Sequence, residues 1–263
     1  MKKILFATTA LVATAGMAAA DMTLSGFGRV GLNYSAAGDT TMDYRWQLGI
    51  TGSVETSSGT TFKIYSRARF DDGNTVDGGF NAPTVTISSG DFTLQLGNTY
   101  SAAGARTNVF GSGTGNLANY GLYDTFATWY ASGVAGTSDR VRADYTMNGM
   151  TISVSGDVDG DERIEAGISG SAGSLNYGVA ASDDDYYAAD VNMAMGDMKV
   201  GARLTNTING MYANYSFGDT SVQGYYGDND DWGIGFSHDL GGASLGAEYN
   251  ETGAGNITVA FSF

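Results

Sequence analysis

Hydrophobic and polar residues alternate with a period of two along most of this chain, and the 3.6-residue period of an amphipathic helix is almost absent. In the stretch TFKIYSRARF at 61–70, Phe62, Ile64 and Phe70 share one face, and three basic residues share the other. Such alternation is typical of a β-strand whose two faces meet different surroundings. Sixteen strands are predicted, at 22–34, 44–54, 61–70, 84–88, 92–98, 140–147, 150–156, 162–170, 174–182, 186–195, 198–204, 210–217, 221–226, 232–238, 243–249 and 256–263.

The connections between these segments are of two kinds that alternate along the chain. One kind is a short turn, of which Asn148-Gly149 is the clearest because Asn-Gly favours a two-residue hairpin. The other kind tends to be longer and acidic, as in DDGNTVDGGFNA at 71–82. An even number of antiparallel strands with short turns at one end and longer loops at the other predicts an up-and-down barrel.

The distribution of charged and aromatic residues favours a membrane barrel over a soluble sandwich. Aromatic residues gather at strand ends, as at Tyr34, Trp46 and Phe92, where a membrane barrel has its aromatic girdles. A charge on the lipid face would cost roughly 2–4 kcal/mol at mid-depth, and the apolar faces carry none. The polar faces carry nearly all cations: Arg29, Arg45, Lys63, Arg67, Arg69, Arg140, Arg142, Arg163, Lys199 and Arg203. We therefore predict an all-β, 16-stranded antiparallel transmembrane β-barrel.

The two ends of the chain fit this prediction. Residues 1–20 read as a cleaved signal peptide, with Lys2 and Lys3, an apolar stretch and an Ala18–Ala20 cleavage site, which leaves 21–263 as the barrel. The closing segment NITVAFSF alternates up to Phe263 and would pair with the first strand, because an open edge is not tolerated in lipid.

Composition excludes several classes of protein. The chain has no cysteine, which excludes a disulfide scaffold and a thiolate metal site. The formal net charge is −15, and it becomes −17 once the two lysines of the leader are removed. Such acidity argues against a nucleic acid as partner.

A long segment between the fifth and sixth predicted strands, about 98–139, breaks the regular spacing. Apart from Arg106, Asp124 and Asp139 it is uncharged, and it is rich in aromatic residues. Segments of this length without strands are usually functional or disordered, and this composition suits one packed against protein. A strand pair within it would raise the number of strands to eighteen.

With these features the chain resembles the trimeric general diffusion porins of Gram-negative outer membranes, most closely the short alphaproteobacterial type. The likeness rests on MTLSGFGRVGLNY at 22–34, the cationic third strand, the long third loop and the strand that ends in phenylalanine. It implies a homotrimer among outer-membrane lipid and lipopolysaccharide. It also implies a water-filled pore for ions and small hydrophilic solutes, narrowed by an in-folded third loop, with neither catalysis nor a cofactor.

The resemblance also implies a constriction with basic residues on the barrel wall and acidic residues on the loop. The candidate pore-lining residues are Arg29, Arg45, Lys63, Arg67, Arg69, Arg106 and Asp124. In the alternative interpretation the wall cations are merely paired with acids such as Asp43, Asp144 or Glu165. The loop departs from the family because it offers mainly Asp124, which predicts a weaker field across the pore. The acidic outer loops would in turn concentrate cations at the mouth.

Three further patterns in the sequence match known motifs only in part. The run GFGRVG at 26–31 fits a dinucleotide-binding fingerprint but lies inside a strand, so we reject that function; its small residues fit close packing, as at a subunit contact. Asp157, Asp159 and Asp161 have calcium-like spacing without the glutamate that completes an EF-hand loop, so they are weak candidates for structural calcium. His238, the single histidine, lies between Ser237 and Asp239, which point to opposite faces and suit no catalytic triad.

Three alternatives to a general porin remain open from the sequence. One is a substrate-selective outer-membrane channel. The other two belong to different classes: a hydrolase built on an outer-membrane barrel, and a structural or adhesive barrel.

Overall fold

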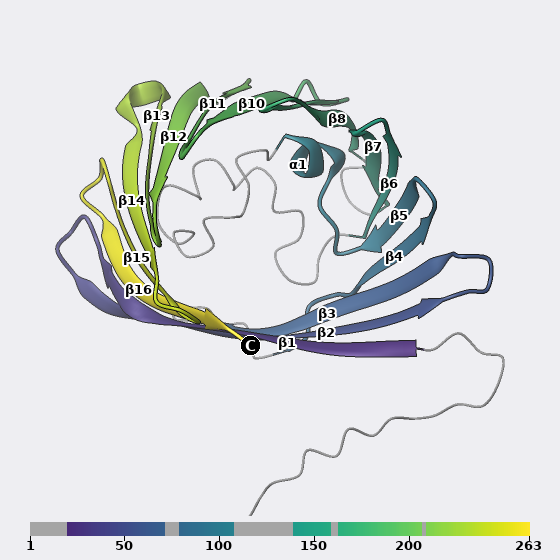
Figure 1. The fold of residues 1–263 in the computed structure, drawn as a ribbon, viewed down its shortest axis with the longest axis horizontal. Coiled ribbons are helices and arrows are strands. Elements are labelled where there is room, and N and C mark those ends of the chain that lie inside the picture. Colours follow the sequence, from purple (N-terminus) through teal and green to yellow (C-terminus); the bar gives the residue numbers. More distant parts are fainter. Residues whose placement is uncertain (1–19, 72–78, 108–138, 159–162, 207–208) are drawn as a thin grey trace, which may run out of the picture.

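The computed structural model describes residues 20–71, 79–107, 139–158, 163–206 and 209–263, which form one closed barrel (Figure 1). Each strand pairs antiparallel with its neighbours in the chain, and β1 pairs with β16 to close the ring. The strands are β1 (Ala20–Tyr34), β2 (Thr40–Glu55), β3 (Thr61–Asp71), β4 (Thr84–Ser89), β5 (Phe92–Gly97), β6 (Arg140–Met147), β7 (Met150–Asp157), β8 (Ile164–Ala172), β9 (Leu175–Ser182), β10 (Tyr187–Met195), β11 (Met198–Thr205), β12 (Asn209–Phe217), β13 (Thr220–Gly227), β14 (Trp232–Asp239), β15 (Ser244–Asn250) and β16 (Gly255–Ser262).

The predicted sixteen-stranded barrel is therefore confirmed. Because β5 pairs directly with β6, the ring closes with sixteen strands and not with eighteen. The largest error in the predicted bounds is at β2, which begins at Thr40 instead of residue 44. Its first residues pair with the end of β1, as in Tyr34 with Thr40, so a stretch that looks like a loop in the sequence extends the ladder.

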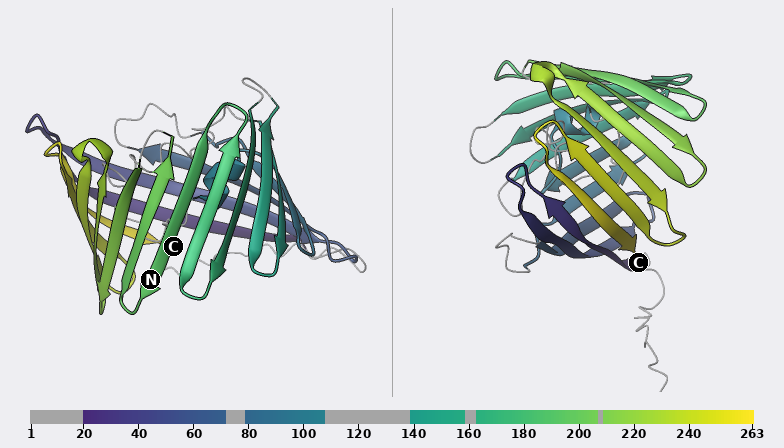
Figure 2. Two further views of the ribbon diagram at one scale, coloured as in Figure 1. Left: turned by 90° about the horizontal axis from the view of Figure 1, so that it is seen from above. Right: turned by 90° about the vertical axis from the view of Figure 1, so that its left-hand side faces the viewer.

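The described residues include two short helices. Helix α1 (Ala102–Arg106) lies inside the ring of strands, whereas the 3-10 helix η2 (Asp228–Asp230) lies in the connection between β13 and β14 (Figure 1). None of the helices in the described ranges is long and apolar enough to cross a membrane. Figure 2 shows the barrel from the side, with its strands tilted and joined by hairpin turns.

The seam between β1 and β16 explains two glycines of the GFGRVG run. Backbone bonds join Gly26 and Phe263 in both directions, at 2.6 and 3.0 Å. A Cβ on Gly26 would overlap the ring of Phe263, and one on Gly28 would lie 2.6 Å from Cζ of Phe261. The two phenylalanine rings stack on each other with their centroids 6.2 Å apart. The small residues thus make room for the aromatic end of the same chain.

The barrel is inverted relative to a soluble protein, because its apolar side chains face outward and its polar side chains are buried. Val30, Val179 and Ile257 are each about half exposed, at 48%, 46% and 50%. On the inner face, Asp190 and Arg203 are only 2% and 3% exposed. An apolar outer band around a polar interior is the pattern of a transmembrane barrel.

This outer band gives a prediction about depth in the membrane. Val179 lies midway along β9, opposite Ile168 and Ala189 of the neighbouring strands, and Leu175 begins the same strand at the turn. Val179→Arg should lower the free energy of unfolding in lipid vesicles by roughly 2–4 kcal/mol, and Leu175→Arg by about 1 kcal/mol or less. Equal losses in a urea titration would mean that this face does not contact the hydrocarbon core.

Candidate functional site

The segment after β5 turns into the barrel at α1. The helix begins after Ser101, whose Oγ accepts a hydrogen bond from the backbone N–H of Gly104 at 3.1 Å. Serine is favoured at this position because it satisfies an N–H group that has no partner within the helix. Ala102, Ala103 and Gly104 are buried against the barrel wall, so the helix packs on the inner surface of the strands.

Two side chains of the wall bind the first turn of α1. Ser155 of β7 accepts a hydrogen bond from the backbone N–H of Ala102 at 2.8 Å, and Glu165 of β8 accepts one from that of Ala103 at 2.9 Å. Both acceptors are at least 95% buried. A carboxylate at this end of a helix also interacts favourably with the partial positive charge there. The wall therefore binds the N-terminal end of α1 through specific partners.

A buried ion pair binds the other end of the helix. Arg203 of β11 donates from Nη2 to the backbone carbonyl of Thr107 at 3.0 Å and to Oδ2 of Asp190 at 2.5 Å. The hydroxyl of Tyr212 donates to the second oxygen of Asp190 at 3.1 Å. The guanidinium is thus oriented by β10 and β12 and serves as the contact between β11 and the inward segment.

Two glycines of the wall have no side chain at the place where α1 packs, and this makes room for the helix. A Cβ on Gly178 of β9 would overlap the carbonyl oxygen of Arg106 and lie 2.8 Å from its carbonyl carbon. A Cβ on Gly167 of β8 would lie 3.0 Å from both the carbonyl oxygen of Ala102 and Cβ of Arg106. The backbone of α1 approaches the strands closely, and only glycine permits this approach at position 178.

Across the lumen from α1, the inner face of β3 carries the predicted cationic strip (Figure 1). Lys63 is exposed, and Arg67 is half-buried and donates to Oε1 of Gln47 at 3.4 Å. Arg69 shares this face, and Arg45 lies on β2 next to it; both interact with other groups of the chain. The predicted loop acid Asp124 lies outside the described residues.

Several other basic residues of the inner wall are paired with acids. Arg29, the remaining wall candidate, donates to Asp43 at 2.8 Å, and both residues are at least 95% buried. Three further pairs are Arg140 with Asp157, Arg142 with Asp144, and Arg163 with Glu165. The acids that were the alternative partners of the strip are therefore bound to other cations. Arg29 contributes little net charge to the lumen for the same reason.

Arg106, the candidate on the loop, turns toward the wall. Its Nη1 donates to Oγ of Ser169 on β8 at 3.3 Å, and its side chain packs over Gly167. Burial lowers the pKa of the Arg106 guanidinium, and the nearby carboxylate of Asp144 partly opposes this change. The group remains a cation and helps to hold α1.

Among the described residues, the remaining candidates are not grouped into a metal or catalytic site. Asp157 is bound by Arg140 at 2.5 and 2.8 Å, and Asp159 and Asp161 lie outside the described residues. Within the described ranges, no three histidine, cysteine, aspartate or glutamate side chains are grouped to hold a metal ion. Nδ1 of His238 is 2.8 Å from the hydroxyl of Thr220, so its ring contacts the neighbouring strand and neither residue beside it in the sequence.

Comparisons with known proteins agree with this geometry. The family model described as Gram-negative porin matches residues 7–263. A porin from Fuscovulum blasticum is 27% identical to the chain, and the match covers 84% of the chain and 89% of that protein. Structures of two mutants of the Rh. blastica porin have the same fold, with TM-scores of 0.75 and 0.76 at 20% identity, covering 92% of this chain and all of theirs.

A barrel of this family with an apolar outer band and a polar lumen is an outer-membrane diffusion channel. The chain belongs to the Gram-negative porin family.

Proposed function

We propose that the channel is a general porin, through which ions and small hydrophilic solutes diffuse passively. The observation that carries this proposal is the inward segment at α1, bound to β7–β11 and facing a wall with accessible cations. A segment fixed against the inner wall of a barrel narrows the aqueous path, and charged groups beside a narrow path act on passing ions. No catalytic step or cofactor is needed for such diffusion.

We place the constriction between α1 and the cationic strip of β3. Lys63 and Arg67 lie on the lumenal face, and their positive potential is focused by the low-dielectric wall around the water. Solutes with a dipole would be oriented there, and small anions would be favoured over cations. The acidic outer loops act in the opposite direction at the mouth, so the net ion selectivity depends on both.

The strip gives a direct prediction about selectivity. The double variant Arg67→Ala with Arg69→Ala should shift the reversal potential under a salt gradient toward cations, because two positive charges are removed from the narrow path. Gln47→Ala is the control: it removes the hydrogen bond to Arg67 and leaves the charge unchanged, so its reversal potential should equal that of the wild type. A double variant with wild-type selectivity would place the strip away from the constriction.

The function and the oligomeric state can be tested together in planar lipid bilayers. We propose a homotrimer, in agreement with the resemblance, so the unboiled protein should insert with a conductance that closes in three equal steps. A folded barrel that carries no current would overturn the porin proposal and would favour a hydrolase or adhesive barrel. Hydrolysis of a lipid substrate by that protein would then distinguish these two.

A further inference from the structure

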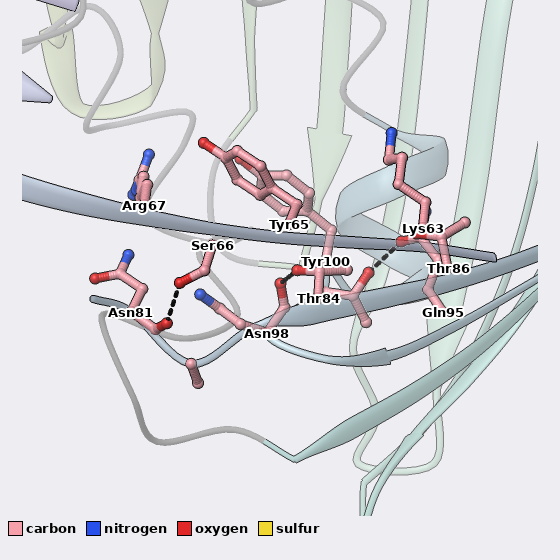
Figure 3. Close-up of a pocket in the computed structure, with 12 residues that line it drawn as sticks. Lys63, Tyr65, Ser66, Arg67, Asn81, Thr84, Thr86, Gln95, Asn98 and Tyr100 are labelled. Atoms are coloured by element: carbon pink, nitrogen blue, oxygen red, sulfur yellow. Dashed lines mark hydrogen bonds between the residues drawn. The ribbon is translucent and has the colours of Figure 1, made fainter. Parts of the chain in front are cut away.

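A hollow of about 350 Å³ lies on the wall that carries the cationic strip (Figure 3). It is formed by β3, by the segment before β4, and by β4, β5 and the residues that follow β5. The structure describes all twelve residues that line it; Lys63 and Arg67 are basic and none is acidic. The hollow is thus polar and positively charged, in a protein with a strongly negative net charge.

The two cations of the hollow differ from most cations of the lumen. Within the described ranges, Lys63 makes no ion pair or hydrogen bond, and the single partner of Arg67 is the neutral amide of Gln47 at 3.4 Å. In contrast, the guanidinium groups of Arg29, Arg142 and Arg203 are each bound to a buried carboxylate. Among the described residues, therefore, no adjacent acid cancels the positive charge of the hollow.

Neutral donors complete the lining. Asn81 and Asn98 contribute side-chain amides, and the hydroxyl of Tyr65 extends between Lys63 and Arg67 (Figure 3). The backbone carbonyls of the two asparagines already accept bonds, from Ser66 at 2.7 Å and from Thr84 at 2.5 Å. These bonds fix the backbone of both residues, and their side-chain amides stay available to a solute.

We propose that this hollow is a binding site for multivalent oxyanions, which are solutes that carry two or more phosphate or carboxylate charges. Lysine, arginine and amide N–H groups bind such oxygens through charge-assisted hydrogen bonds. Lys63 and Arg67 are four residues apart on one strand, which separates their Cα atoms by about 13 Å. This spacing favours an extended anion that reaches both cations. This site rests on the proposed pore function and adds to it a class of solute that is retained at the wall.

The test uses the purified channel in planar bilayers with potassium chloride on both sides. Tripolyphosphate, citrate and inorganic phosphate are added in turn, and the concentration that halves the current is measured. Tripolyphosphate and citrate, which each carry several charged groups, should block at lower concentrations than inorganic phosphate, and the more potent of the two identifies phosphate or carboxylate chemistry. Lys63→Gln and Arg67→Gln should each raise the half-blocking concentration of tripolyphosphate about fivefold or more.

Lys199→Gln is the matched control. It removes one cation from the inner face of β11, which lies on the opposite wall, and it should leave the half-blocking concentration within about twofold of the wild type. An equal loss in Lys199→Gln and Lys63→Gln would overturn the site in favour of a general effect of lumenal charge. A channel that conducts chloride and is not blocked by any probe would overturn the site and leave the porin function intact.

Equilibrium dialysis of tripolyphosphate against the detergent-solubilised barrel keeps the inference testable if no current is seen. Saturable binding that is weakened by Lys63→Gln and retained by Lys199→Gln would support the site in a barrel that does not conduct. Absence of binding by the wild-type barrel would overturn it. Circular dichroism of each variant confirms that the barrel has folded before either measurement is interpreted.

Discussion

Gly178→Ala should lower the unitary conductance of the channel and make the current unsteady. The added methyl group would overlap the carbonyl oxygen of Arg106 and lie 3.1 Å from Cα of Thr107, and backbone atoms cannot turn away as a side chain does. The strand side of α1 is the barrel wall, so the helix can move only toward the lumen. Overpacking of this kind costs typically 1–3 kcal/mol, which is enough to loosen the bonds at both ends of the helix.

The matched control is Gly224→Ala on β13. It makes the same chemical change in a strand, but its Cβ would come no nearer than 3.4 Å to the carbonyl oxygen of Gly233. Single-channel recordings of both variants should show a reduced, fluctuating level for Gly178→Ala and a wild-type level for Gly224→Ala. Wild-type conductance in Gly178→Ala would mean that the position of α1 does not limit the current.

The fold could be predicted from the sequence because each strand has a pattern that depends only on residues close to it in the chain. Period-two alternation, turn residues such as Asn148-Gly149 and the final aromatic strand each depend on neighbours in the chain, and sixteen local signals determine one closed ring. The face of each strand that points into the barrel could be predicted from the same alternation, because charged residues share a face with other polar residues. The observed burial of Asp190 and exposure of Val179 agree with it.

Contacts between distant segments could not be predicted in the same way. The pairing of Arg29 with Asp43 needs the register of β1 against β2, and the partners of Gly26 and Gly28 need that of β1 against β16. The surface that binds α1 is even harder to predict from the sequence, because Ser155, Glu165 and Gly178 are ordinary residues for a barrel strand. The one sequence feature that indicates this surface is a small residue at an inward position, and it becomes informative only after the strands are aligned.

These hidden contacts show how the wall of this barrel is divided. The side from β7 to β11 uses charges and glycines to bind the inward segment, and Arg163 and Arg203 on this side are paired with acids. The side from β3 to β5 leaves Lys63 and Arg67 for solutes. In the function that we propose, one wall fixes the width of the pore and the other acts on the solutes that pass, so mutations on the two sides should affect stability and selectivity separately.

Arg203→Met tests this division on the binding side, where we expect the largest loss of stability. The variant leaves Asp190 buried without its cation and removes the donor to the carbonyl of Thr107. Breaking a buried ion pair by removing one partner costs about 3–5 kcal/mol, because the remaining charge is desolvated and uncompensated. Urea unfolding in detergent or vesicles should show a loss of this size. Lys199→Met, which removes a cation from the same strand, should stay close to the wild type.

A second variant separates the ion pair from its action on the helix. Replacing both partners, as in Arg203→Met with Asp190→Leu, should recover most of the lost stability, because no uncompensated charge is left in the wall. It should not recover a steady current, because the carbonyl of Thr107 still lacks its donor. If the double variant regained both properties, Arg203 would stabilise the barrel without holding the inward segment. If it regained neither the stability nor the steady current, the hydrogen bond from Tyr212 to Asp190 would be the main contribution to both properties.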